Sequence, residues 1–419
     1  MKLTVHPSSL QGTVVAPPSK SVFQRVVAAS LLSKSTTRLT NPCFVDDGLA
    51  SLSMAGALGA TIEEDGEDLI VTGGYSPRQE FLEAGESGLG IRLFTPLTAL
   101  HHEPLEIRAG GSLTKRPMNQ LADPLREMGA QFESTDGFAP LKVCGPLKPG
   151  TAHVDGSLSS QYVTGMLMAL ATLDGDSVMN VSNAKSTPYI DMTIEVMAAF
   201  GVDVIHKNYE RFDVFGNQVY ECDTVHTPGD WSAGAMLLVA AAISGGGLVR
   251  VAGLDNSFTQ ADQSIAGAML FAGCKLANEP DGIRVTAHKI RGFKFDATDC
   301  PDLFPPLAAL ACYADKPSEI TGIHRLASKE SDRALALQSE LGKVGIKVEL
   351  KSDVMIIHPG PIQPAEIDSH EDHRIAMALA LIALGGASIT IAGAECVSKS
   401  YPEFWDDISD LGAQVVPVG

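Results

Sequence analysis

A recurring pattern of apolar and polar positions runs through the chain: an amphipathic helix, a glycine, a small or apolar residue, and then an alternating strand. Glycine directly after a helix is typical of a left-handed cap, so one occurrence indicates only that a helix ends there. Six occurrences at nearly constant spacing predict a repeated supersecondary unit. The glycines are Gly59, Gly129, Gly201, Gly273, Gly345 and Gly412, which lie 70, 72, 72, 72 and 67 residues apart by subtraction.

A second pattern has the same period and consists of apolar helices with a polar start. Each repeat of about 70 residues therefore holds two helices, one largely buried and one with a solvated face, together with several strands. Helices that alternate with strands indicate an α/β fold. The apolar helices begin near Arg25, Arg92, Gln161, Trp231, Leu303 and Arg374, at offsets of 67, 69, 70, 72 and 71 residues.

Six repeats exceed what one hydrophobic core normally holds, so we group them as three plus three. The seam is placed near residues 227–230, midway through the array. The sixth repeat ends before its second strand, and the N-terminal strand at residues 3–5 could supply the missing partner. We therefore expect a first three-unit domain at 19–228 and a second at 1–18 and 229–419, completed by the N-terminal strand.

Composition restricts the kinds of ligand. With 45% hydrophobic and 19% charged residues, the chain of 419 residues is typical of a compact soluble protein. Its formal charge of −19 argues against a general nucleic-acid binder, which needs a broad basic surface. A site for a small anion must therefore be a local concentration of basic residues in an acidic molecule.

The seven cysteines form neither a CxxC pair nor a Cys/His ligand cluster, which favours reduced thiols over a disulfide framework or a zinc site. Residues 1–7 lack the apolar core of a signal peptide, and the apolar runs are too short to span a bilayer. We therefore expect a cytoplasmic protein. Because the repeats can satisfy their own cores, we also expect a monomer.

Residues 16–25 concentrate anion-binding chemistry. Two prolines keep the chain extended, so a helix can begin only near Ser19, which can cap it. Lys20 adds a charge at the positive end of this helix, and Ser21 and Arg25, four residues apart, share one face. An ordinary capped helix with a solvated lysine and arginine is the alternative, and the recurrence of the arrangement argues against it.

The starts of the next two apolar helices are also polar. Residues 85–92 offer glycines that let backbone N–H groups approach a ligand, although a plain tight turn explains the same pattern. Residues 155–161 gather hydroxyls and an amide suited to a polyhydroxylated ligand, whereas N-capping explains one of their serines and leaves two.

Eight of the 31 basic residues lie near predicted helix starts or in nearby loops. One such residue alone is usually a surface charge, but together they predict a site for two anionic substrates. Asp302 and Glu330 are carboxylates in this cationic field and are suited to proton transfer once burial tunes their pKa. With no metal-ligand spacing and no obvious thiol nucleophile, the residues predict acid–base catalysis without a cofactor or metal. The eight are Lys20, Arg25, Arg92, Arg116, Lys329, Arg333, Arg374 and Lys399.

Nine motifs in order along the chain resemble those of the EPSP synthase family, the 3-phosphoshikimate 1-carboxyvinyltransferases. The resemblance implies the enolpyruvyl transferase fold, an α/β (α+β) architecture of two domains of three βαβαββ units each, with the active site in a cleft that closes on substrate. The motifs are Pro18-Ser19-Lys20-Ser21 with Arg25, Ser87-Gly88 with Arg92, Lys115-Arg116-Pro117, residues 156–161, residues 188–193, Pro301-Asp302, residues 329–333, Asp372-His373-Arg374 and Lys399.

The resemblance also implies an activity, the transfer of the enolpyruvyl group of phosphoenolpyruvate to the 5-hydroxyl of shikimate 3-phosphate, with release of phosphate. This is the step of the shikimate pathway that leads toward chorismate and the aromatic amino acids. Asp302 would take the proton from the attacking hydroxyl, and Glu330 would protonate the methylene carbon to give a tetrahedral intermediate. Lys20 and the arginines would stabilise the developing charge, and His373 is grouped with these catalytic residues.

The resemblance assigns the other site residues to the two substrates. Those implied for shikimate 3-phosphate are Lys20, Ser21, Arg25, Ser159, Ser160, Gln161, Ser186, Tyr189, Asp302 and Lys329. Those implied for phosphoenolpyruvate are Lys20, Gly88, Arg116, Gln161, Arg333, Arg374 and Lys399, and Arg92 is placed with the substrate-binding residues. Where many members have Asn-Ala-Gly-Thr, this chain has Glu86-Ser87-Gly88-Leu89, with a carboxylate and a bulky apolar residue beside the expected phosphoenolpyruvate site.

Two other interpretations stay open. The sister transferase that acts on UDP-N-acetylglucosamine shares the fold and the donor, but it normally has a cysteine in a loop of the first half, and residues 113–116 contain none. The chain could also be a binding protein for phosphorylated acids without catalysis. Asp302 and Glu330 argue against that class, because uncompensated carboxylates weaken anion binding.

Overall fold

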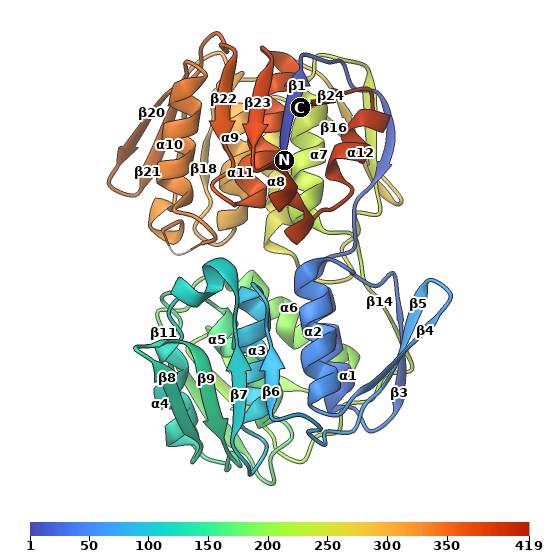
Figure 1. Cartoon of the computed structure of the whole chain (residues 1–419), viewed down its shortest axis with the longest axis vertical. Helices are drawn as coiled ribbons and strands as arrows, with labels where there is room; N and C mark the ends of the chain where they lie inside the picture. Colours follow the sequence, from blue (N-terminus) through green and yellow to red (C-terminus); the bar gives the residue numbers. More distant parts are fainter. Residues whose placement is uncertain (328, 419) are drawn as a thin grey trace. The chain divides into compact units, whose positions relative to one another are not determined.

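The computed structural model describes residues 1–327 and 329–418, and the chain divides into two compact units (Figure 1). We call Pro18–Pro228 with Ser257–Thr259 the first unit. The second unit comprises Met1–Pro17, Gly229–Asn256 and Gln260–Gly419. Residue 419, the end of the predicted range 229–419, lies outside the described residues.

Each unit contains three four-stranded mixed sheets built on one plan. An outer strand pairs in parallel with its neighbour, and the next two pairings are antiparallel. The sheets of the first unit are β14 (Thr224–His226), β3 (Thr36–Thr40), β5 (Asp68–Thr72), β4 (Thr61–Asp65); β6 (Phe81–Glu83), β7 (Leu105–Arg108), β9 (Phe138–Cys144), β8 (Gln131–Thr135); and β10 (Thr151–Asp155), β11 (Ser177–Ser182), β13 (Arg211–Val214), β12 (Val204–Lys207).

The second unit repeats this plan. Its sheets are β2 (Gly12–Val15), β15 (Leu248–Ala252), β17 (Gly282–Thr286), β16 (Lys275–Glu279); β18 (Lys294–Asp296), β19 (Ser318–Thr321), β21 (Val354–His358), β20 (Lys347–Lys351); and β22 (Ala365–Asp368), β23 (Ile389–Ala392), β1 (Lys2–His6), β24 (Gln414–Pro417).

Both ends of the chain lie in the last of these sheets. β1 lies between β23 and β24 and pairs antiparallel with both, so that Thr4 is opposite Thr390 on one side and Val416 on the other. Leu3 and Val5 alternate with these positions and are buried, as the two-residue period of a strand requires. The N and C marks of Figure 1 accordingly lie beside β1 and β24.

Each repeat also carries two α-helices that differ in burial. In the first helix of the second repeat, all eleven residues are buried, whereas the second helix of the fourth repeat buries three of seven. The first helices are α1 (Lys20–Leu32), α3 (Gly88–Thr98), α5 (Gln161–Leu170), α7 (Trp231–Ile243), α9 (Phe304–Cys312) and α11 (His373–Gly385). The second helices are α2 (Asp46–Ala57), α4 (Ala122–Glu127), α6 (Pro188–Ala199), α8 (Ile265–Phe271), α10 (Arg333–Lys343) and α12 (Phe404–Asp410).

The six glycines of the repeat confirm the predicted caps. Each lies two residues after the end of a second helix and has a positive φ, from 77° at Gly201 to 123° at Gly59. A side chain there would be strained, so glycine lets the chain turn from the helix into the following strand. Short 3-10 helices complete the chain: η1 (Gly111–Lys115), η2 (Asn119–Leu121), η3 (Ala261–Ser264), η4 (Pro301–Leu303), η5 (Ile323–Arg325) and η6 (Ala394–Lys399).

The first helices form the core of each unit. In the first unit, α3 packs against α1 and α5, and in the second unit α7, α9 and α11 pack against one another. Sheets cover them: α3 packs on β7 and β9, and α11 packs on β1 and β23. Each fully buried leucine or phenylalanine contributes about 1.5–3 kcal/mol to such a core. This packing brings the polar starts of the buried helices close together within each unit.

The seven cysteines are free thiols. Within the described residues, no helix is both long enough and apolar enough to cross a membrane.

Candidate active site

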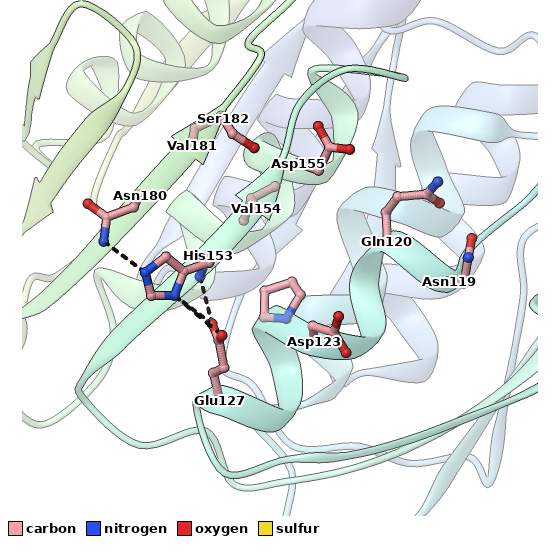
Figure 2. Close-up of a pocket in the computed structure, with 11 residues that line it drawn as sticks. Asn119, Gln120, Asp123, Glu127, His153, Val154, Asp155, Asn180, Val181 and Ser182 are labelled. Atoms are coloured by element: carbon pink, nitrogen blue, oxygen red, sulfur yellow. Dashed lines mark hydrogen bonds and ion pairs between the residues drawn. The ribbon is translucent and has the colours of Figure 1, made fainter.

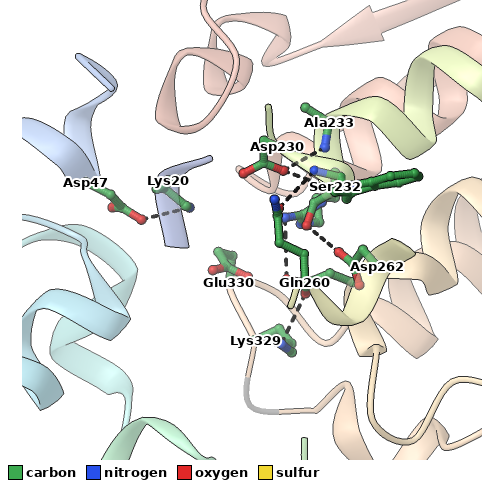
Figure 3. Close-up of polar contacts among 12 residues, drawn as sticks. Lys20, Asp47, Asp230, Ser232, Ala233, Gln260, Asp262, Lys329 and Glu330 are labelled. Carbon is green, nitrogen blue, oxygen red and sulfur yellow. Dashed lines mark hydrogen bonds and ion pairs between the residues drawn. The ribbon is translucent and has the colours of Figure 1, made fainter. Parts of the chain in front are cut away.

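The start of α1 does not use the predicted cap. Ser19 is the N-cap residue and is fully buried, but its side chain makes no capping hydrogen bond, so this prediction is wrong. The returning chain holds the position, because the Ser19 N–H donates to the Pro228 carbonyl at 2.7 Å. The next residue, Lys20, places Nζ 2.8 Å from the Asp47 carboxylate of α2 (Figure 3). Lys20 therefore has a counter-charge before any substrate binds.

Arg25 is a buried cation with neutral partners. Its Nε donates to Thr193 Oγ1 at 2.9 Å, and its other nitrogens donate to the carbonyls of Ser21 at 2.7 Å and Tyr189 at 3.2 Å. No carboxylate among the described residues lies within ion-pair distance of it. Burial lowers the pKa of Arg25 to about 10, so the group stays charged at neutral pH. Because an unpaired buried charge is costly, this arrangement favours an anionic ligand.

Arg92 joins three segments of the first unit. Its NH1 donates to the Gln161 amide oxygen at 2.8 Å, and its NH2 donates to the Pro117 carbonyl at 3.3 Å. The guanidinium also lies 5.0 Å from the centre of the Tyr162 ring. The predicted residues at the starts of α3 and α5 are therefore in direct contact.

The predicted hydroxyls precede α5 and α6. Ser159 Oγ accepts a hydrogen bond from the Gln161 N–H at 3.2 Å, whereas Ser160, the N-cap residue of α5, makes no side-chain cap. Ser186 has a φ of 52°, which is rare for a residue other than glycine, and its carbonyl accepts from the Tyr189 N–H at 3.0 Å. Such strained positions cluster at ligand sites.

Gly88 lets a cation lie against the backbone. A Cβ at this position would be 2.5 Å from a guanidinium nitrogen of Arg116, so a larger residue would displace the guanidinium. Leu89 is 8% exposed and belongs to the hydrophobic core of the first unit.

Arg333 holds three carboxylates of the second unit together. Its NH1 donates to Asp302 at 2.7 Å, its NH2 to Glu330 at 2.7 Å, and its Nε to Asp372 at 2.8 Å. The side chain is 1% exposed, and although burial alone would lower its pKa, the three carboxylates raise it well above the ordinary value. The two predicted proton-transfer groups thus bind neighbouring nitrogens of one guanidinium. The implied contact of Arg333 with phosphoenolpyruvate stays a prediction.

Asp302, in η4, is surrounded by cations. Besides Arg333, it accepts a hydrogen bond from Lys329 Nζ at 3.1 Å and lies 3.4 Å from a guanidinium nitrogen of Arg374. Burial alone would raise the pKa of Asp302, but Arg374, Lys329 and Arg333 hold it well below its usual range. The carboxylate is therefore ionised in the free protein.

The start of α11 carries the remaining predicted residues. Asp372 is its N-cap residue, and its carboxylate accepts from the Arg374 N–H at 3.0 Å. His373, the first residue of the helix, is 2% exposed. Lys399 Nζ, at the end of η6, donates at 3.3 Å to the carbonyl of Glu371, the residue before the cap. One helix start therefore brings Arg374, His373 and Lys399 together.

A carboxylate that the sequence analysis did not single out belongs to the same group. Asp262, in η3, is 1% exposed, and its Oδ2 accepts a hydrogen bond from Ser232 Oγ at the start of α7 (Figure 3). Burial, followed by the charge of Asp302, raises the pKa of Asp262 to about 7, although Arg374 acts in the opposite direction. Asp262 lies just before the second helix of its repeat, as Glu330 does. Comparing this position among the repeats could have identified Asp262 from the sequence.

Replacing Asp262 by asparagine should stabilise the second unit more at pH 8 than at pH 5. In the unfolded chain the carboxyl of Asp262 has a pKa of about 3.9, the ordinary value for aspartate. In the folded protein its pKa is about 7, so the proton stays bound to a higher pH. Between these values the native state binds more protons than the unfolded state, so rising pH costs about 1.4 kcal/mol per pH unit. The variant lacks this cost, so its Tm advantage should grow from pH 5 to pH 8.

Tryptophan fluorescence can follow this change, because both tryptophans, Trp231 and Trp405, belong to the second unit. Asp281→Asn is a matched control: Asp281 is exposed, and its hydrogen bond with Arg250 lowers its pKa, so both states are ionised above pH 5. Its Tm difference from the parent should stay constant over this range. A constant difference for Asp262→Asn as well would contradict the raised pKa.

The first unit also has a surface hollow of about 560 Å³ near β10 and β11, which no predicted site residue lines (Figure 2). Its lining includes the carboxylates of Asp123, Glu127 and Asp155. Glu127 accepts from the His153 N–H at 2.7 Å, and Asp155 from the Ser157 N–H at 3.0 Å. These carboxylates disfavour anions, so we place the substrate site at the helix starts and not in this hollow.

The predicted site residues thus divide between the two units, and the contacts above join several of them within each unit. Among the described residues, no cluster of histidine, cysteine, aspartate and glutamate has the arrangement needed for a metal ion. The first-unit group is Lys20, Ser21, Arg25, Gly88, Arg92, Arg116, Ser159, Ser160, Gln161, Ser186 and Tyr189. The second-unit group is Asp302, Lys329, Glu330, Arg333, His373, Arg374 and Lys399.

Comparison with solved structures first gives the class of the fold. The enolpyruvyl transferase NikO from Streptomyces tendae matches with a TM-score of 0.78 over 99% of this chain and 98% of that chain, at 19% identity. An EPSP synthase from Acinetobacter baumannii matches with a TM-score of 0.85 over 99% of this chain and 100% of that chain, at 26% identity. The fold is that of the enolpyruvyl transferases, which confirms the predicted α/β architecture.

Comparison of sequences then gives the family. The family model for EPSP synthase (3-phosphoshikimate 1-carboxyvinyltransferase) matches residues 5–408. A Clostridium kluyveri protein named 3-phosphoshikimate 1-carboxyvinyltransferase is 36% identical over 418 residues, which cover 99% of this chain and 98% of that protein. The chain belongs to the EPSP synthase family, and the resemblance inferred from its motifs is confirmed.

Proposed function

We propose that this chain is the enzyme that transfers the enolpyruvyl group of phosphoenolpyruvate to the 5-hydroxyl of shikimate 3-phosphate. The products are 5-enolpyruvylshikimate 3-phosphate and phosphate, in the shikimate pathway toward chorismate and the aromatic amino acids. Family membership over residues 5–408 supports the reaction. The observation that carries the mechanism is that one buried guanidinium, Arg333, binds both Asp302 and Glu330.

The first unit contributes most of the contacts proposed for shikimate 3-phosphate. Arg25 supplies a buried charge whose partners are neutral, and this charge suits the phosphate. The hydroxyls of Ser159, Ser160 and Ser186 and the amide of Gln161 suit the hydroxyls of the ring. Lys20 exchanges its bond with Asp47 for a bond to substrate when the anion arrives.

Cations suit the two anionic ends of phosphoenolpyruvate. Arg116 lies against the Gly88 backbone, with its guanidinium where a Cβ would otherwise be. Arg374 and Lys399 lie at the start of α11 and bind carboxylate or phosphate through charge-assisted hydrogen bonds.

Asp302 is proposed as the base that takes the proton of the attacking hydroxyl. In the free protein three cations stabilise its ionised form. Substrate anions compete for Lys329 and Arg374, so the basicity of Asp302 rises when both substrates are bound. This coupling limits proton removal to the complete complex.

Glu330 is proposed as the acid that protonates the methylene carbon of phosphoenolpyruvate. Anionic substrates near Glu330 favour its neutral form, which can donate the proton. The hydroxyl oxygen bonds to C2, C3 becomes a methyl group, and a tetrahedral intermediate results. Loss of a methyl proton and of phosphate then restores the double bond. Lys20 and the arginines stabilise the charge that develops. His373, the first residue of α11, is proposed to assist them.

The cytoplasmic location, the monomeric state and the independence from a cofactor that the sequence leads us to expect belong to this proposal as well.

The test is whether phosphate release from phosphoenolpyruvate depends on the acceptor. We expect release when shikimate 3-phosphate is present and none above background with UDP-N-acetylglucosamine in its place. Release with UDP-N-acetylglucosamine would assign the chain to the sister activity. Tight binding of both anions without any release would assign it to the class of binding proteins.

A further inference from the structure

Glu86, two residues before the start of α3, makes a specific contact with another loop. Its Oε2 accepts hydrogen bonds from the Ser112 N–H at 3.0 Å and from Ser112 Oγ at 2.9 Å. Beside it, the Gly110 N–H donates to the Gly85 carbonyl at 2.7 Å. The turn before α3 is therefore bonded to the start of η1 through both side chain and backbone.

Gly111 shapes this contact. Its φ is 48°, and a Cβ there would lie 2.3–2.6 Å from the carboxyl atoms of Glu86. Any other residue would be strained by its backbone and would also collide with the carboxylate. The glycine thus forms the surface on which the Glu86 carboxylate rests.

The segment that starts at this contact ends at Arg116. Leu113 is fully buried and fixes the middle of η1. At the far end, the Pro117 carbonyl accepts hydrogen bonds from Tyr162 Oη at 2.9 Å and from Arg92 at 3.3 Å. Glu86 therefore secures the beginning of the segment, and Tyr162 and Arg92 secure its end.

We propose that Glu86 is a positioning residue that holds residues 110–116 so that the Arg116 guanidinium lies at Gly88 before phosphoenolpyruvate binds. This inference rests on the proposed function of Arg116 as a ligand of phosphoenolpyruvate. Charge-assisted hydrogen bonds from Ser112 fix the loop, and the bound anion then does not have to order it. The carboxylate acts through Arg116 and does not touch the substrate.

Kinetics of Glu86→Ala test the proposal. The KM for phosphoenolpyruvate should rise about tenfold with kcat nearly unchanged, because the ligand must now order the loop. The Kd of shikimate 3-phosphate alone should not change, and Glu86→Gln, which still accepts from Ser112, should recover most of the loss. Glu83→Ala removes an exposed carboxylate three residues earlier and should behave as the parent.

A double-mutant cycle separates positioning from a general loss of structure. In the Arg116→Ala background, Glu86→Ala should change the KM by less than about twofold, since both residues act on one contact. An undiminished tenfold effect in that background, or an unchanged KM in the single variant, would overturn the proposal.

Limited proteolysis gives a readout that does not need activity. Trypsin cleavage after Lys115, an exposed residue of η1, should be about tenfold faster in Glu86→Ala than in the parent or in Glu83→Ala. Unchanged cleavage would overturn the positioning role. If the parent releases no phosphate but cleavage accelerates as expected, the proposed function fails while Glu86 still holds the loop.

Discussion

Replacing Asp302 by asparagine should lower kcat by about 10³-fold, within the range that general acid–base groups contribute. Asparagine has the same shape and can still accept hydrogen bonds from Lys329 and Arg333, but it cannot take a proton. Binding of the two anions should be kept or tightened, because Arg374 no longer faces an opposing carboxylate. Steady-state phosphate release measures kcat, and calorimetry measures Kd. Asp302→Ala should also abolish turnover and largely spare binding.

Asp296→Asn provides the control for this variant. Asp296 ends β18, six residues before Asp302, and its exposed carboxylate accepts a hydrogen bond from the Thr298 N–H at 2.9 Å. Its kcat should match that of the parent. An Asp302→Asn enzyme with a kcat within tenfold of the parent would show that another group removes the proton.

Replacing Arg333 by methionine should lower the free energy of unfolding by about 3–5 kcal/mol, the usual cost of removing one partner from a buried ion pair. Asp372 is fully buried and would lose the cation that balances it, and Asp302 and Glu330 would lose a hydrogen bond each. Urea denaturation followed by tryptophan fluorescence reports the unit that contains Arg333.

Two further variants make the stability result specific. Arg284→Met removes an arginine of the same unit whose side chain is 43% exposed and that pairs with Glu279, and it should cost less than about 1 kcal/mol. Adding Asp372→Asn to Arg333→Met should recover part of the loss, because it removes a buried charge that has become unpaired. An Arg333→Met protein as stable as Arg284→Met would show that the buried network contributes little to the stability of the second unit.

The fold could be predicted because its main signal is local. A glycine such as Gly59 or Gly345 is required by the positive φ that follows a helix, and six such positions at one spacing define the repeat. The position of β1 in the last sheet depends on contacts between the two ends of the chain. The sequence indicated it only through the strand that the sixth repeat lacks.

The site could be predicted less fully, because its residues are far apart in the sequence and come into contact only in the folded protein. The cations at the starts of the first helices were visible as charges in apolar surroundings. Asp47 and Asp262 were not, since a carboxylate near a helix start is usually a solvated cap. Both precede or begin the second helix of a repeat, so comparing that position across repeats would have pointed to them. The bond from the Ser19 N–H to the Pro228 carbonyl, more than 200 residues away, is likewise a contact that the local sequence does not indicate.

The central claim is that Asp302 and Glu330 move protons through an addition followed by an elimination. The most direct test is to form the product from phosphoenolpyruvate and shikimate 3-phosphate in D₂O and to record its NMR spectrum. We expect an enolpyruvyl ether at O5 whose methylene carries deuterium, because that carbon becomes a methyl group before it loses a hydrogen. An ether with an undeuterated methylene, or phosphate without any ether, would contradict the mechanism.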